Sequence, residues 1–186
     1  MQTTYTGLRG YIEAERQMYA QHSVFGDLKG FSFTYADILE WFLENAEEFT
    51  GNNLDLVEEV RGSMPFKPEI KQCYHNSMTY QNGFRGNADI DYVEGWATSV
   101  IPLNHAWNVV NDRVADTTWA LIREKESNDD YIGVRIPASF IGRVISHSSP
   151  YREAWCAGPF LYDYIAVQLM NEGEYERYFQ RNAEEE

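Results

Sequence analysis

A cysteine, a histidine and an aspartate follow one another in the middle of this chain, and each belongs to a different predicted element. Cys73 begins a predicted helix, whereas His105 and Asp116 lie on two predicted strands, at separations of 32 residues (73 to 105) and 11 residues (105 to 116). Thiol acyl-transfer chemistry needs a sulfur nucleophile, an imidazole that takes its proton and a carboxylate that orients the imidazole. Because such residues meet in space rather than in sequence, the pattern predicts a fold that brings these three elements together.

The dipeptide Asn111-Asp112 predicts a two-residue turn between the strands that carry the histidine and the aspartate. In that register Val110 pairs with Arg113, and His105 and Asp116 are diagonal neighbours on the same face of the sheet. Diagonal neighbours lie about 7 Å apart at the backbone, within reach of a hydrogen bond between an imidazole and a carboxylate. A three-residue turn would place Asp116 on the opposite face, so the register favours the pair.

Hydrophobic periodicity and turn residues predict an α+β architecture in which helices flank a small antiparallel sheet and pack against it. Thr34 and Asp37 have the spacing of a capping box at a helix start, and Gly51 is the expected end of that helix. We expect a single domain with a helical N-terminal region (1–62), a Cys-His-Asp core (63–120) and a C-terminal region of one strand followed by helices (121–186). The predicted helices are 11–21, 34–51, 53–61, 73–81, 139–145, 150–156, 160–170 and 175–182, and the predicted strands are 90–101, 105–110, 113–118 and 131–136.

The composition predicts a folded, soluble protein of the cytoplasm. Hydrophobic residues make up 44% and aromatic residues 15% of the 186 residues, which is enough for a core. The 2 cysteines do not make a disulfide scaffold and fit a reducing compartment. The first residues lack a basic region followed by an apolar run, so we expect no signal peptide, and no apolar stretch approaches the length of a transmembrane helix.

The chain is strongly acidic, with a formal net charge of −14 from 29 acidic and 15 basic residues. Such a charge disfavours phosphate backbones and anionic membranes, so we expect neither a nucleic acid nor a membrane as a partner. It leaves a second interpretation open, in which an acidic surface occupies a basic, nucleic-acid-binding protein. The sequence does not indicate an oligomeric state.

The segment from Cys73 to Trp119 resembles the transglutaminase-like branch of the papain-like cysteine enzymes. The resemblance rests on a cysteine that opens a helix, on the strand 92–98, and on the motifs His105-Ala-Trp-Asn and Asp116-Thr-Thr-Trp. That family places its cysteine at a helix N-terminus and its histidine and aspartate on adjacent antiparallel strands, in this chain order. The string Tyr-Val-Glu-Gly-Trp-Ala within the first strand is also similar to small bacterial and phage proteins of unassigned activity.

The resemblance implies a papain-like α+β core in which Cys73 is the nucleophile, His105 the general base and acid, and Asp116 the orienting carboxylate. It covers about residues 70–120 and does not extend to the helical flanks. Two positions depart from the family pattern: Gln72 stands where a glycine is common, and Thr117 stands where a proline is usual. Each of these two positions is adjacent in sequence to Cys73 or Asp116, and neither is one of the three residues of the implied triad.

Four further residues are candidates for the oxyanion site or the cleft. Free backbone N–H groups at a helix start stabilise a thiolate and a developing oxyanion, and Gln72 is a candidate second donor. Asn76, one turn into the helix, is a second oxyanion candidate that alternatively satisfies local backbone groups. Glu94 is either an inward polar group near the cleft or a solvent-facing edge residue, and Trp107 is expected to shield the catalytic pair from water or to pack in the core.

No metal or organic cofactor is expected. The chain has only 2 cysteines and 4 histidines and lacks the paired spacings that hold structural zinc. Its glycines do not form a phosphate-binding loop. Cys156 has no acid–base partners in a motif of its own and is interpreted as a small buried hydrophobic residue.

These features lead to two hypotheses about function. The first is a cysteine acyl-transfer enzyme that acts on an amide, either hydrolysing a peptide or a glutamine side chain or transferring the acyl group to an amine. Its substrate would be a protein or peptide, with an amine as co-substrate in the case of transfer. The second is an acidic, non-catalytic binding or inhibitor protein in which the triad is vestigial. The reactivity of the Cys73 thiol distinguishes the two.

Overall fold

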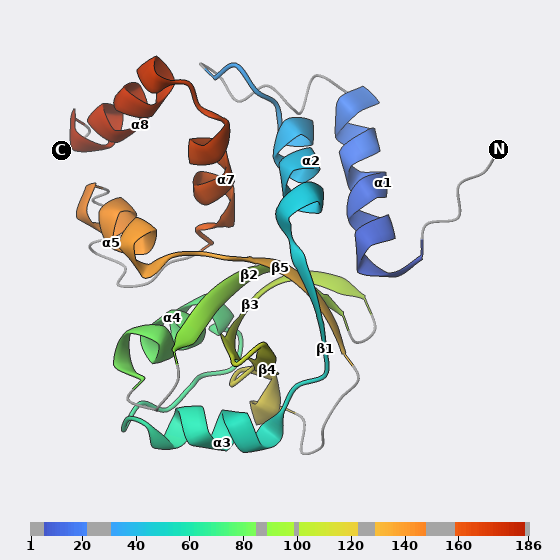
Figure 1. The fold of residues 1–186 in the computed structure, drawn as a ribbon, viewed down its shortest axis with the longest axis vertical. Helices are drawn as coiled ribbons and strands as arrows, with labels where there is room; N and C mark the ends of the chain where they lie inside the picture. The colour runs from blue at the N-terminus through green and yellow to red at the C-terminus, as the bar shows by residue number, and fades with distance from the viewer. Residues whose placement is uncertain are drawn as a thin grey trace.

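A five-stranded antiparallel sheet forms the centre of the described structure, with the strand order β1-β5-β2-β3-β4 (Figure 1). The computed structural model describes residues 6–21, 31–84, 89–98, 101–122, 129–147 and 159–184. The strands are β1 (Glu47–Thr50), β2 (Ile90–Thr98), β3 (Pro102–Val110), β4 (Arg113–Ala115) and β5 (Asp130–Arg135).

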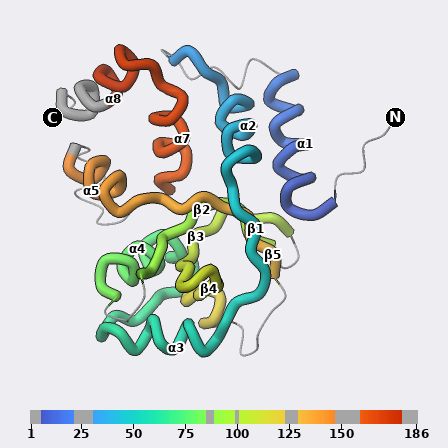
Figure 2. The backbone as a smooth tube through the Cα atoms, in the orientation of Figure 1, coloured from blue at the N-terminus to red at the C-terminus, as the bar shows by residue number. Residues whose placement is uncertain are grey.

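Helices flank this sheet, so the fold is α+β as predicted. In Figure 1, α1, α2, α5, α7 and α8 lie above the sheet, α4 lies to the left beside the strands, and α3 lies below them. The path of the tube in Figure 2 shows α2 beside α7, and these two helices are in contact, so segments from both ends of the chain meet. The helices are α1 (Gly7–Gln21), α2 (Tyr35–Asn45), α3 (Leu54–Gly62), α4 (Cys73–Gly83), the 3₁₀ helix η2 (Trp119–Leu121), α5 (Ala138–His147), α7 (Leu161–Leu169) and α8 (Glu172–Glu184).

The largest hydrophobic cluster joins one face of the sheet to helices from both ends of the chain. On β2, Tyr92 and Trp96 are buried in this cluster, and Trp96 meets the ring of Phe42 on α2 edge to face at 4.7 Å. Ile12 of α1 and Ile165 of α7 are fully buried in the same cluster. The expectation that the flanking helices pack against the sheet is therefore confirmed for α1, α2, α5 and α7.

A second cluster on the opposite face of the sheet carries the histidine. Because side chains alternate along a strand, Val93 of β2 faces away from the large cluster and packs with Trp107 of β3. His105 precedes Trp107 by two positions on β3 and shares its face. Trp119 and Tyr131 complete this aromatic environment.

The start of α2 follows its predicted capping box, but its predicted end is wrong. The backbone N–H of Asp37 donates to Oγ1 of Thr34 at 3.3 Å, and the backbone N–H of Thr34 donates to the Asp37 carboxylate at 2.6 Å. The helix ends at Asn45 rather than at Gly51, and the next residues form β1, which pairs with β5. Pairing with this distant strand buries Phe49 in the second cluster and overrides the helical spacing of the apolar residues.

The β3–β4 hairpin has the predicted register, with Val110 opposite Arg113. Its two turn residues adopt φ angles of 50° and 59°, the left-handed values that the favoured two-residue hairpin turn requires. The second arm is shorter than predicted, because β4 ends at Ala115 and the chain turns at Asp116 instead of continuing as a strand to Thr118.

The remaining predicted elements agree with the structure to within a few residues, except for the helix 150–156, which lies outside the described residues. Asn53 caps α3, since its side chain accepts a hydrogen bond from the N–H of Leu56 at 3.0 Å.

In the described ranges, no helix has both the length and the apolar character needed to cross a membrane.

Candidate active site

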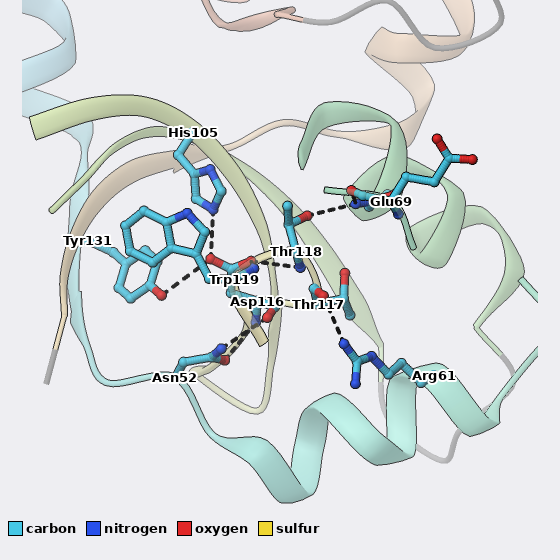
Figure 3. Close-up of polar contacts among 10 residues, drawn as sticks. Asn52, Arg61, Glu69, His105, Asp116, Thr117, Thr118, Trp119 and Tyr131 are labelled. Carbon is cyan, nitrogen blue, oxygen red and sulfur yellow. Dashed lines mark hydrogen bonds and ion pairs between the residues drawn. The ribbon is translucent and has the colours of Figure 1, made fainter. Parts of the chain in front are cut away.

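His105 and Asp116 form a buried pair at the end of the β3–β4 hairpin. Nε2 of His105 lies 2.6 Å from Oδ2 of Asp116 (Figure 3). His105 is 4% exposed and Asp116 is fully buried, so water competes little for this contact. The structure thus brings together the two residues that the hairpin register placed on one face.

Asp116 is held in place by three further donors. Its Oδ1 accepts hydrogen bonds from the backbone N–H groups of Thr118 at 3.0 Å and Trp119 at 2.9 Å. The hydroxyl of Tyr131 donates to Oδ2 at 3.3 Å (Figure 3). A carboxylate with this many donors is fixed in orientation.

Asn52, in the turn that follows β1, holds the main chain of Asp116. Its side-chain oxygen accepts from the Asp116 N–H at 2.8 Å, and its side-chain nitrogen donates to the Asp116 carbonyl at 3.0 Å. Sequence reasoning missed Asn52 and the Tyr131 contact, because both are long-range and neither residue belongs to a recognisable motif.

Cys73 is the first residue of α4, the position that the sequence predicts. Its thiol is free of disulfide bonds and 9% exposed. The preceding residue, Gln72, makes no side-chain cap hydrogen bond, so it does not occupy the N–H groups of the first helical turn. These groups remain suited to a developing negative charge.

His105 also forms a hydrogen bond with Cys73. Nε2 of His105 is engaged by Asp116, which leaves Nδ1 for the hydrogen bond between His105 and Cys73. Burial lowers the pKa of His105, but the charge and hydrogen bond of Asp116 together with the contact to Cys73 raise it to about 10. At neutral pH the ring is therefore protonated, which is the form that pairs with a thiolate.

Two tryptophans lie against the imidazole. The ring of Trp119 stacks on His105 at 4.6 Å and an interplanar angle of 25°, and Trp107 lies nearly parallel to His105 at 6.3 Å. Trp107 is fully buried and Trp119 is 9% exposed. Trp107 therefore packs in the core beside His105, where it shields His105 and Asp116 from water, and it does not line an open cleft.

Asn76 satisfies local backbone groups, which is one of the two alternatives that the sequence left open, and it is not available to an oxyanion because both of its N–H donors are occupied. Its side-chain nitrogen donates to the carbonyl of Glu69 at 2.7 Å and to Oγ1 of Thr118 at 2.8 Å, and its oxygen accepts from the Glu69 N–H at 3.1 Å. Asn76 instead ties the loop before Cys73 to the turn that follows Asp116. Gln72 is exposed, and its role as an oxyanion donor stays a prediction.

Glu94 is an inward residue, so the solvent-facing alternative is wrong. It lies on the central strand β2, is 1% exposed, and accepts hydrogen bonds from the backbone N–H groups of Phe160 and Leu161 at 2.8 Å each and from the hydroxyl of Tyr92. Burial raises the pKa of Glu94 to about 7, against the opposing effect of these hydrogen bonds. Glu94 therefore anchors the start of α7 to the sheet.

Among the residues that the structure describes, no group of three or more His, Cys, Asp or Glu side chains could hold a metal ion. Cys156 lies outside these residues. Searches against protein-family models, curated proteins and solved structures found no significant match to this chain.

Proposed function

We propose that this protein is a cysteine acyl-transfer enzyme that acts on an amide through a thioester intermediate. The observation that carries the proposal is the chain of contacts from Cys73 through His105 to Asp116, with Nε2 of His105 at 2.6 Å from the carboxylate. A buried, oriented imidazole beside a thiol at a helix start is the arrangement that activates a sulfur nucleophile.

The proposed mechanism assigns one task to each residue. The Cys73 thiolate attacks the carbonyl carbon of the amide, and the N–H groups at the start of α4 stabilise the oxyanion that forms. The His105 imidazolium then donates its Nδ1 proton to the leaving amine, and the C–N bond breaks to give a thioester. Water or an amine, deprotonated by His105, attacks the thioester and releases the thiol. Asp116 holds the imidazole in the tautomer that serves both steps.

The order and pairing of the elements support the papain-like, transglutaminase-like assignment. A helix that opens with the cysteine packs against the strands β2 and β3, and the histidine strand continues by a tight turn into the strand that leads to the aspartate. Hydrolysis and transamidation share every step up to the thioester, so the triad supports both outcomes equally. The substrate class in this proposal is a protein or peptide amide.

Thiol labelling tests the proposal without knowledge of the substrate. Native protein is treated with iodoacetamide at about pH 6, where an ordinary thiol is almost entirely protonated, and labelled peptides are quantified for both cysteines. We expect Cys73 to react before Cys156, and we expect His105→Ala to remove this advantage. Modification of Cys156 first, or the same Cys73 rate in His105→Ala, would contradict the assignment. Inert thiols together with tight binding to a basic protein would favour the acidic binding protein.

A further inference from the structure

A carboxylate oxygen of Glu15, on α1, is buried without a hydrogen-bond partner among the described residues. Burial raises the pKa of Glu15. The neighbouring cations of the helix are committed elsewhere: Arg16 forms two hydrogen bonds of 2.8 Å with Glu13, and Arg9 binds Glu48 at 2.6 Å. A desolvated carboxylate oxygen of this kind is unfavourable unless a donor or a cation reaches it.

Three tyrosines from different helices gather beside this carboxylate and form what we term the tyrosine cage (Tyr19, Tyr35 and Tyr162). The rings of Tyr19 and Tyr35 meet at 4.4 Å with an interplanar angle of 71°, and those of Tyr35 and Tyr162 at 5.5 Å and 45°. The hydroxyl of Tyr35 donates to that of Tyr162 at 2.9 Å. All three residues are partly buried.

The tyrosine cage is linked to both Glu15 and the candidate nucleophile. The charge of Glu15 acts on Tyr35 and on Tyr162, whose pKa values are raised mainly by burial. Tyr74 directly follows Cys73, and its pKa is raised by burial and then by the charges of Glu94, Cys73 and Tyr162. The phenol of Tyr74 thus lies within electrostatic reach of both the Cys73 thiol and Tyr162 of the cage.

We propose that Glu15 and the tyrosine cage form a subsite for an alkylammonium group, such as a lysine side chain, on the amide substrate that acylates Cys73. This inference rests on the proposed function and names its substrate class. Electron-rich ring faces attract a cation, and an ammonium group supplies the donors that Oε2 of Glu15 lacks. The net charge of −14 favours the approach of such a substrate.

The chemistry assigns the subsite to the acyl donor rather than to an amine acceptor. An attacking amine must be neutral and must reach the thioester carbon, whereas a carboxylate favours the protonated, non-nucleophilic ammonium form. The charges of Cys73 and of Tyr162 both act on Tyr74, and the cage suits a part of the substrate other than the reacting carbonyl.

Charge selectivity in the labelling of Cys73 tests the subsite. The probes are three kinds of N-alkyl iodoacetamide, whose alkyl tether ends in a primary ammonium, a methyl group or a carboxylate. Each kind is prepared over the same series of tether lengths. Cys156→Ala serves as the background, so that Cys73 is the one cysteine present. Glu15→Gln removes the proposed charge. Glu13→Gln is the matched control, since it removes the same charge from the same helix at a carboxylate that already binds Arg16.

We expect the ammonium probe to react about fivefold faster than the methyl probe at its best tether length in the background and in Glu13→Gln. In Glu15→Gln this ratio should fall to about one, while the methyl probe keeps its rate. An equal ratio in Glu15→Gln and Glu13→Gln, or no preference for the ammonium probe in the background, would overturn the subsite. The methyl probe carries no charge for the subsite to bind, so its absolute rate reports on the activation of the Cys73 thiol alone. A slow methyl probe would therefore contradict the proposed function, whereas a lost preference for the ammonium probe would contradict the subsite.

Discussion

Asn52 fixes the main chain of Asp116 with a pair of hydrogen bonds, one to its N–H at 2.8 Å and one to its carbonyl at 3.0 Å. Asn52 is 5% exposed and follows the edge strand β1, whereas Asp116 follows the opposite edge strand β4. The sheet curls so that these two edge strands approach each other, and the N–H of Asn53 donates to the carbonyl of Val114 on β4 at 3.0 Å. The carboxylate that orients His105 is therefore positioned by a residue that follows the strand at the other end of the strand order.

We expect Asn52→Ala to lower both stability and thiol reactivity. The buried N–H of Asp116 loses its partner, whereas the Asp116 carbonyl keeps the hydrogen bond from the N–H of Ala120 at 3.2 Å. We expect a cost of about 1 to 3 kcal/mol in the free energy of unfolding, measured by urea denaturation. Asn53→Ala is the matched control, because it removes the cap of α3 at a cost of about 1 kcal/mol without touching Asp116. The labelling rate of Cys73 should fall in Asn52→Ala and stay unchanged in Asn53→Ala. Equal rates in the two folded variants would show that Asn52 acts on stability alone.

Asp116→Asn separates the charge of the carboxylate from its shape. The asparagine oxygen still accepts from the N–H groups of Thr118 and Trp119, but the imidazolium of His105 loses its counter-charge. We expect the labelling rate of Cys73 at about pH 6 to fall at least about tenfold. Tyr131→Phe removes the 3.3 Å hydrogen bond to Asp116 but keeps the negative charge, and it should change the rate far less. Similar rates in both variants would argue against an electrostatic role for Asp116.

Glu94 should make the stability of the protein depend on pH. Its folded pKa of about 7 lies above the ordinary value of 4.5, so the folded state binds this proton more tightly than the unfolded state. The resulting stabilisation is fully present below the ordinary pKa and is lost as the pH rises through the folded pKa. Between about pH 5 and about pH 8, wild type should lose on the order of 2 kcal/mol more than Glu94→Gln, measured by urea denaturation. Parallel pH profiles for the two proteins would contradict this.

Gly95 allows the close approach of β2 and β5 beside the histidine. It pairs with His105 on one side and with Gly133 on the other, and an added Cβ would meet the carbonyl oxygen of Ile132 at 2.1 Å. We expect Gly95→Ala to cost about 1 to 3 kcal/mol in thermal or urea unfolding. The control is Gly142→Ala on the exposed face of α5, where a Cβ meets no atom within 4 Å. That substitution should be neutral or stabilise by about 0.5 to 1 kcal/mol.

The local parts of the fold were predictable because short-range chemistry determines them. The turn at Asn111-Asp112 sets the hairpin register, and with it the face that His105 and Asp116 share. The same holds for the capping box at Thr34 and for the cap of α3 at Asn53. In each of these cases the residues that decide the structure lie within a few positions of one another.

The long-range parts were not predictable from one sequence. Strand β1 has a single buried residue, Phe49, and its pairing with β5 carries no local signal. Asn52 reaches Asp116 only because β1 lies where it does, and the hydrogen bond from Asn76 to Thr118 spans 42 positions of the sequence. Glu94 looked ambiguous because the strand order, which makes β2 central, was unknown.

Acylation of Cys73 by p-nitrophenyl acetate tests the central claim most directly. We expect a burst of p-nitrophenol and an acetyl thioester on Cys73, found by mass spectrometry of the acid-quenched protein. The burst should be absent in Cys73→Ala and at least about tenfold slower in His105→Ala, whose thiol lacks its acid and base. An acetyl group found elsewhere, or a burst of unchanged rate in His105→Ala, would contradict the account of Cys73 as a nucleophile activated by His105.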